Sequence, residues 1–104
     1  MITYTTSDNK KLSVIDSKFS DISFHEYNDC GVVIFNSDFI SGLQNISLGS
    51  TLTSINLPDG VWIINNAFTD TRITEIHIPK KCNTITNLFS GSDTLKVITV
   101  DKEN

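Results

Sequence analysis

LTSINLPDGVWIINNAFTDTR, residues 52–72, is followed directly by ITEIHIPKKCNTITNLFSGSDT, residues 73–94. When the two stretches are aligned at their first residues, apolar side chains recur at six positions and a proline recurs at a seventh. The aligned pairs are Leu52/Ile73, Ile55/Ile76, Leu57/Ile78, Pro58/Pro79, Val61/Cys82, Ile64/Ile85 and Phe68/Phe89. A third stretch, LKVITVD (residues 95–101), repeats the first three apolar positions. The chain therefore contains an internal repeat whose units begin at Leu52, Ile73 and Leu95.

Each unit opens with the pattern L-x-x-I-x-[IL], followed at once by proline in the two full units. A short, bent strand would turn the first, fourth and sixth positions inward, and proline would end it because proline has no N–H to donate. Two further inward residues and a phenylalanine then return the chain to its start. Stacked units would align their strands in a parallel sheet. The repeat therefore predicts a mainly β solenoid in which each coil covers the apolar edge of the next coil.

An earlier and degraded unit precedes the clear repeats. Val33 and Phe35 resemble Ile55 and Leu57, Phe39 or Ile40 resembles Val61, and either Gly42 or Leu43 would fill the next inward position. Ile46 or Ser47 would then stand where Phe68 stands later. With this unit, the pattern predicts about 2.5–3.5 coils over residues 37–104.

The first 36 residues have the pattern of a β-cap on the first coil. Ile22–Tyr27 (ISFHEY) alternates, with Ile22, Phe24 and Glu26 expected on one face. The turn residues 28–31 (NDCG) separate this stretch from 32–35 (VVIF), which predicts a hairpin. Residues 1–6 (MITYTT) form a third candidate strand. We therefore expect a cap over residues 1–36 and a solenoid over residues 37–104, together forming one structural domain.

Composition agrees with β structure and excludes several functions. The 104 residues include fourteen Ile and twelve Thr but one Ala, and β-branched residues favour strands. A net charge of −4 with eight Lys and Arg argues against nucleic-acid binding, which needs clustered cations. No apolar run is long enough to span a membrane. No secretory signal is visible at the N-terminus, which favours a virion or cytoplasmic location over secretion.

The repeat L-x-x-I-x-[IL]-P-x-x-[VC]-x-x-I-x-x-[AL]-F resembles the BspA-like leucine-rich repeat of bacterial and phage proteins. The opening MITYT, with SFHEY and GVVIF after it, is similar to the β-cap that precedes such repeats. In each unit Asn65 or Thr86 stands where the family usually has glycine. The resemblance implies a short solenoid that serves as a non-enzymatic interaction scaffold, with adhesive or structural roles and no catalytic residues.

A zinc site and a disulfide are both disfavoured. His25 and Cys30 share a five-residue step with His77 and Cys82, which is a donor set that zinc could use. The two pairs would lie about two coils apart, however, or roughly 10 Å at ~4.8 Å per strand. Cys82 also occupies an inward position, where a cysteine acts as a small apolar residue. The same separation argues against a Cys30–Cys82 disulfide, so we expect no metal and no cofactor.

An enzymatic function is also disfavoured. The sequence has no G-x-S-x-G motif, and both histidines fall in expected strands, so a Ser–His–Asp triad is not indicated. We expect no catalytic residues, and a small hydrolase stays a third alternative.

The candidate binding residues form three groups. Ser54, Asn56, Glu75, His77, Val97 and Thr99 should point outward from the repeat strands, and Asn56, Glu75 and His77 are the ones we select. Trp62 and Ile63 should also point outward, and an exposed Trp is typical of binding surfaces. Leu95, Ile98 and Val100 belong to a last strand with a bare edge. The alternatives are a merely solvated face, packing of Trp62 on the cap, and solvation of the edge by the polar C-terminus.

Together these features predict a non-enzymatic protein–protein interaction or structural module. Its partner would be another protein or a second copy bound through the C-terminal coil, in a larger assembly such as a phage virion. The alternative is a bacterial cell-surface adhesin-type module that binds a host protein or glycan.

Overall fold

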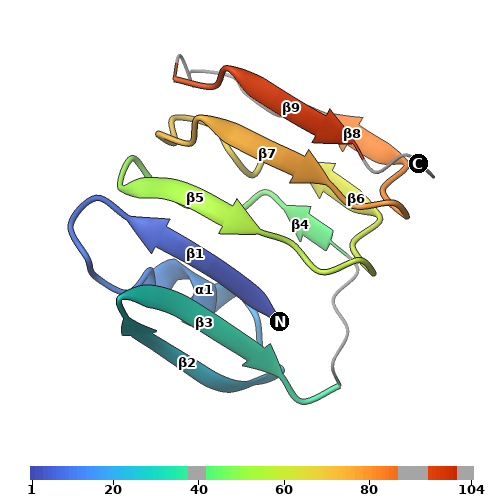
Figure 1. The fold of residues 1–104 in the computed structure, drawn as a ribbon. Helices are drawn as coiled ribbons and strands as arrows, with labels where there is room; N and C mark the ends of the chain where they lie inside the picture. Colours follow the sequence, from blue (N-terminus) through green and yellow to red (C-terminus); the bar gives the residue numbers. More distant parts are fainter. Residues whose placement is uncertain (38–41, 87–93, 101–104) are drawn as a thin grey trace.

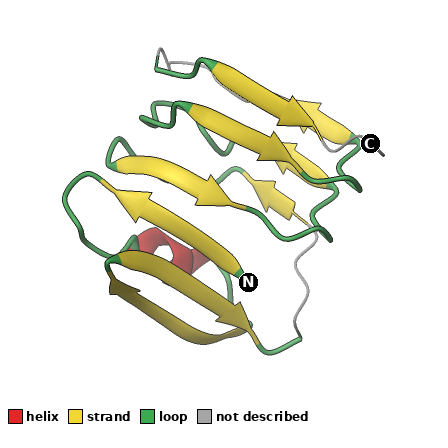
Figure 2. Ribbon diagram, in the orientation of Figure 1, coloured by secondary structure: helices red, strands yellow, loops and turns green. Residues whose placement is uncertain are grey.

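The computed structural model describes residues 1–37, 42–86 and 94–100, and these residues are mainly β-strand with a single short helix (Figures 1 and 2). The expectation of a mainly β chain is therefore confirmed. The elements in chain order are β1 (Ile2–Thr6), α1 (Ser13–Lys18), β2 (Ile22–Asn28), β3 (Cys30–Phe35), β4 (Gly42–Gln44), β5 (Leu52–Asn56), β6 (Ile63–Asn65), β7 (Glu75–Ile78), β8 (Thr84–Thr86) and β9 (Val97–Val100).

The strands form two layers that face each other (Figure 1). One layer holds the four-stranded sheet β2-β3-β1-β5 and, beside β5, the two-stranded sheet β7-β9. The other layer is the three-stranded sheet β4-β6-β8. Helix α1 lies against the inner side of the β1 and β3 end of the first layer. The apolar core fills the space between the layers.

Parallel pairing joins residues one repeat apart. Ile64 of β6 is the register partner of Leu43 in β4 and of Ile85 in β8. Ile76 of β7 is paired in the same way with Ile98 of β9. Leu43 rather than Gly42 therefore fills the inward position of the degraded unit. Gly42 is needed for a different reason, because a Cβ there would lie 2.2 Å from Cγ2 of Ile63.

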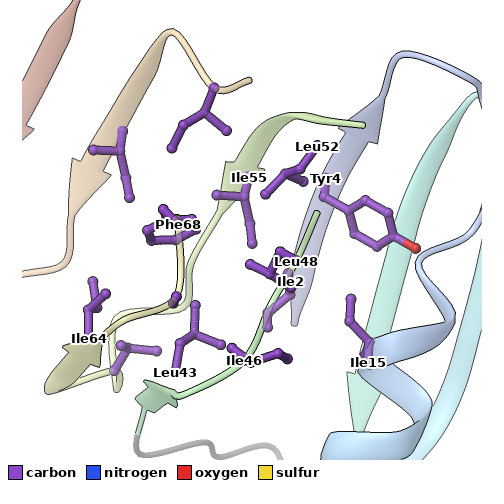
Figure 3. Close-up of a cluster of buried hydrophobic side chains, with 14 of the residues drawn as sticks. Ile2, Tyr4, Ile15, Leu43, Ile46, Leu48, Leu52, Ile55, Ile64 and Phe68 are labelled. Carbon is purple, nitrogen blue, oxygen red and sulfur yellow. The ribbon is translucent and has the colours of Figure 1, made fainter. Parts of the chain in front are cut away.

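The inward positions of the repeat form the core (Figure 3). Leu43, Ile46 and Leu48 extend the cluster toward Ile2 and Tyr4 of the N-terminal sheet. The two clear units bury nine of their inward residues, namely Leu52, Ile55, Val61, Ile64 and Phe68 from the first and Ile73, Ile76, Ile78 and Cys82 from the second.

Three inward positions differ from the rest. Leu57 is half-buried and packs against the edge of the core. Ile85 is 41% exposed, and β8 is the last strand of its sheet among the described residues. The expectation that Ile85 is buried was therefore wrong. Phe89, which we expect to stack on Phe68, lies outside the described residues, and so do Phe39 and Ile40, the candidates for the position of Val61 in the degraded unit.

The predicted N-terminal hairpin is confirmed, but its faces differ from the expectation. Strands β2 and β3 pair antiparallel around Asp29, which has a φ of 67°. A bulge interrupts the register between Ile22 and Phe24. Because one extra residue reverses the alternation of a strand, His25 is buried while Phe24 is 45% exposed. Phe24 and Glu26 share the exposed face, as expected, but Ile22 is partly buried against the core, so the expectation was wrong for Ile22.

Strand β1 is the third strand of this sheet, as predicted, and it lies between β3 and β5, antiparallel to both. Val33 and Phe35 are buried, but they do not adjoin Ile55 and Leu57 as a preceding coil would. The ring of Tyr4 lies against Gly31, its register partner in β3. A Cβ on residue 31 would lie 2.2 Å from that ring, so this position requires glycine. Helix α1 was not predicted from the sequence, since six residues with one buried side chain, Ile15, are too few to show helical periodicity.

The turns after β4 and β6 use asparagine in the left-handed conformation. Asn45 has a φ of 51°, and Asn66, its counterpart one repeat later, has a φ of 55°. Asparagine tolerates this region better than most residues. Asn65 and Thr86, expected to replace the usual glycine, instead end strands β6 and β8. The repeated asparagines at 45 and 66 were a signal that the sequence alignment had overlooked.

None of the helical residues in the described part of the chain forms a helix long and apolar enough to cross a membrane.

Candidate functional site

A hollow of about 170 Å³ opens between β5 and β7 on the outer side of the first layer. Its walls come from three strands: Ser54, Ile55 and Asn56 of β5; Glu75, Ile76 and His77 of β7; and Thr99 of β9. Strands β5 and β7 are neighbours in contact, but they belong to separate sheets with no ladder of backbone hydrogen bonds between them. This seam is where the hollow forms.

Alternation along the strands presents polar groups to the hollow. Ile55 and Ile76 are buried in the core, so the residues on either side of each point outward. These flanking residues bring a hydroxyl, an amide, a carboxylate and an imidazole to one place. Three of the residues selected from the sequence, Asn56, Glu75 and His77, therefore lie together as expected for outward positions.

His77 is oriented by Thr99 of the neighbouring strand. Its Nδ1 lies 2.9 Å from Thr99 Oγ1, and Thr99 Oγ1 lies 3.4 Å from the carbonyl oxygen of Ile76. The hydroxyl has one proton, and the Ile76 carbonyl can only accept. Thr99 therefore donates to that carbonyl and accepts from His77 Nδ1–H, and in the neutral imidazole this leaves Nε2 as a hydrogen-bond acceptor.

Strand β1 holds the β5 side of the hollow. Asn56 Nδ2 donates to Thr3 Oγ1 over 3.1 Å, and Ser54 Oγ lies 2.5 Å from Thr5 Oγ1. Because the amide nitrogen of Asn56 is bonded to Thr3, the amide oxygen is left to accept hydrogen bonds. On the β7 side, Glu75 is exposed, and the one close pairing of an acidic with a basic side chain among the described residues joins Asp16 and His25.

Trp62 and Ile63 lie elsewhere, at the start of β6 in the other layer (Figure 1). Trp62 is 43% exposed, as predicted, and its carbonyl oxygen accepts hydrogen bonds from Asn83 N and Thr84 N. Ile63 is half-buried beside Gly42. The structure therefore separates these two residues from Asn56, Glu75 and His77.

The third group lies at the end strands. Ile98 and Val100 of β9 are 51% and 53% exposed, and Leu95, just before β9, is half-buried. Their register partners one strand inward, Ile76 and Ile78, are each 2% exposed. The same repeat positions are thus buried in β7 and open in β9.

A buried hydrogen-bond chain in the N-terminal sheet was not predicted from the sequence. Tyr4 Oη lies 2.6 Å from His25 Nε2, and His25 Nδ1 lies 3.0 Å from Asp16 Oδ1. The backbone N–H of Leu12 donates to Tyr4 Oη over 3.0 Å. The phenolic oxygen of Tyr4 thus accepts from Leu12 and shares a second hydrogen bond with His25 Nε2, while His25 Nδ1 faces Asp16. The bulge between Ile22 and Phe24 turns His25 inward. No sequence pattern indicates that bulge, so the sequence has no signal for this chain.

This chain has the order of groups found in catalytic triads, but its hydroxyl is enclosed. Tyr4 and the His25 side chain are both buried, and burial, the largest influence, raises the pKa of Tyr4 above its ordinary value. An enclosed, protonated phenol is a poor nucleophile. The arrangement instead ties α1 to the N-terminal sheet.

The zinc donor set does not assemble among the residues that the structure places. No three His, Cys, Asp or Glu side chains in residues 1–37, 42–86 and 94–100 form a group that could hold a metal ion. Both ring nitrogens of His25 already have partners. Cys82 is buried in the core and Cys30 is half-buried, and no disulfide joins the two.

Comparison with protein-family models, curated proteins and solved structures finds no match to this chain.

Proposed function

We propose that the chain is a short solenoid of the BspA-like leucine-rich-repeat type, with an N-terminal β-cap, that works as a non-enzymatic interaction or structural module. The parallel pairing of residues one repeat apart supports the solenoid. The observation that carries the function is the contrast between Ile76, at 2% exposure, and its register partner Ile98, at 51%. The repeat position that is buried in β7 is therefore exposed to solvent in β9.

Two strand edges coincide with this open end. Among the described residues, strands β8 and β9 are each the last strand of their sheets, and both carry exposed apolar side chains at positions that face the core in the preceding strands, namely Ile85, Ile98 and Val100. The edge of a sheet presents unpaired N–H and C=O groups that pair readily with another strand. Backbone pairing and apolar burial would therefore act together in docking.

The proposed occupant is a second copy of this chain, since two-fold dimers are the commonest oligomers. If β9 pairs antiparallel with itself with Thr99 on the two-fold axis, Ile98 lies opposite Val100 of the partner subunit. Residues directly opposite in such a pair share a face. This register therefore brings the exposed apolar residues together, and the module would enter a larger assembly, such as a phage virion, as a dimer.

The test is solution mass by light scattering on a sizing column, over a range of protein concentrations. The wild-type chain should form a dimer, and Ile98→Lys should make it a monomer because a buried charge is costly at an interface. Val97→Lys is the matched control. This substitution adds the same charge at the adjacent residue of β9. Its side chain lies on the opposite face of the strand, where the register partner of Val97 is Glu75.

The proposal is contradicted if the wild type is monomeric at all concentrations, or if Val97→Lys and Ile98→Lys dissociate the dimer equally. A monomer that binds host glycans or proteins would support the adhesin alternative instead.

A further inference from the structure

We propose that the hollow between β5 and β7 binds an arginine side chain of a partner protein. This site lies on the outer face of the first layer. It is defined by Asn56, Glu75, His77 and Thr99 together with Ser54. It does not depend on self-association through β9, so the two proposals can fail separately.

The polar groups of the hollow are mainly acceptors. The neutral imidazole of His77 presents Nε2 as an acceptor, because its Nδ1–H is bonded to Thr99. Asn56 uses its amide nitrogen on Thr3, which leaves the amide oxygen to accept. Glu75 adds two carboxylate oxygens. A ligand that fits these groups must donate several hydrogen bonds at once.

The negative charge of Glu75 in the hollow favours a cationic ligand. Glu75 has no ion-pair partner among residues 1–37, 42–86 and 94–100, and the whole chain has a net charge of −4. Thr99 and Ser54 are neutral, and no lysine or arginine of the described segments lines the hollow. A bound cation would therefore meet an unneutralised carboxylate and no repulsive charge from these walls.

Size and shape favour arginine. The volume of about 170 Å³ lies below the roughly 300–1,000 Å³ of sites for whole small molecules, so the hollow suits a single side chain. Its acceptors come from two strands on opposite sides of the seam. The planar guanidinium directs five N–H donors outward in a fixed fork and can stack on an aromatic ring such as His77. The lysine ammonium is a compact point charge with three donors.

The experiment is a titration of ¹⁵N-labelled protein with N-acetyl-arginine-N-methylamide, followed by amide chemical shifts. The control ligands are the citrulline analogue, which has the same shape without the charge, and the lysine analogue. We expect saturable shifts at β5, β7 and β9 with the arginine compound, and binding that is several-fold weaker with lysine. Citrulline should not bind.

Glu75→Gln should weaken binding of the arginine compound about tenfold or more, because hydrogen bonds between two charged groups are the strongest that this site can make. Glu26→Gln removes an exposed carboxylate from β2, away from the hollow, and should leave binding unchanged. The titration is repeated on the Ile98→Lys variant, which should bind equally well whether or not the wild type is a dimer.

Three results would overturn the proposal: no saturable shift, binding of citrulline as tight as that of arginine, or unchanged binding after Glu75→Gln. Equal affinity for lysine and arginine would overturn the assignment of arginine as the occupant.

Discussion

Tyr4 and His25 share a hydrogen bond of 2.6 Å between Oη and Nε2 inside the N-terminal sheet, where both side chains are buried. The two residues come from β1 and β2, which are not neighbours, because β3 lies between them. The bond therefore crosses a strand, and with Asp16 it links the sheet to α1.

Tyr4→Phe should destabilise the protein by about 1–3 kcal/mol, because it removes the acceptor of the Leu12 N–H and the hydrogen-bond partner of His25 Nε2 from a buried site. Tyr27→Phe is the matched control. Its hydroxyl accepts from Thr6 N at a less buried position, so we expect a smaller loss, about 0.5–1.5 kcal/mol. Urea unfolding measures both. Equal losses of unfolding free energy would mean that the Tyr4–His25 hydrogen bond adds nothing to stability beyond what the Tyr27 hydroxyl contributes.

Asn66→Ala should cost about 1–2 kcal/mol because the turn after β6 needs a left-handed residue. Asn66→Gly should change stability little, since glycine adopts this conformation freely. At the preceding residue, Asn65 in β6, the order should reverse, and glycine should be worse than alanine. Thermal unfolding of the four variants checks the crossed pattern, and the same order at both positions would refute the assignment of the turn residue.

Asp21 joins the two ends of the hairpin through Ser37. Its Oδ2 accepts from the hydroxyl of Ser37 over 2.5 Å and from the Ser37 backbone N–H over 3.0 Å. These bonds, the hydroxyl first, lower the pKa of Asp21 below its ordinary value. Since the folded pKa is the lower one, this stabilisation is complete above the unfolded pKa and is lost as the pH falls through the folded pKa.

Asp21→Asn should therefore lower the urea midpoint at neutral pH, and the gap from wild type should close as the pH falls below the range of an ordinary aspartate. Glu26→Gln is the exposed-carboxylate control and should show no such gap. A difference between wild type and Asp21→Asn that is independent of pH would show that the loss does not come from the ionised carboxylate.

Cys30 should react with iodoacetamide faster than Cys82, by about tenfold or more. Cys82 is buried in the core, and burial raises the pKa of its thiol, so little reactive thiolate is present. Mass spectrometry of the peptides during labelling of the native protein gives both rates, and unfolding in urea should abolish the difference. Faster labelling of Cys82 would contradict its place in the core.

Much of the candidate site could be read from the sequence. The positions of Asn56, Glu75 and His77 on the outer face follow from the alternation around Ile55 and Ile76, which the repeat shows twice. The hollow itself could not be foreseen. It exists because the ladder is interrupted between β5 and β7, and the making or breaking of a ladder depends on how whole strands pack.

The sequence by itself determined most of the buried residues of the repeat, because a pattern that recurs from one unit to the next places the same side chains inward in each. It also determined the hairpin, whose turn residues lie next to one another along the chain. Only the tertiary structure decided that β1 enters between β3 and β5 and that a bulge turns His25 inward toward Tyr4. Those features depend on contacts between residues distant in sequence, and local pattern contains no information about which distant strand is chosen.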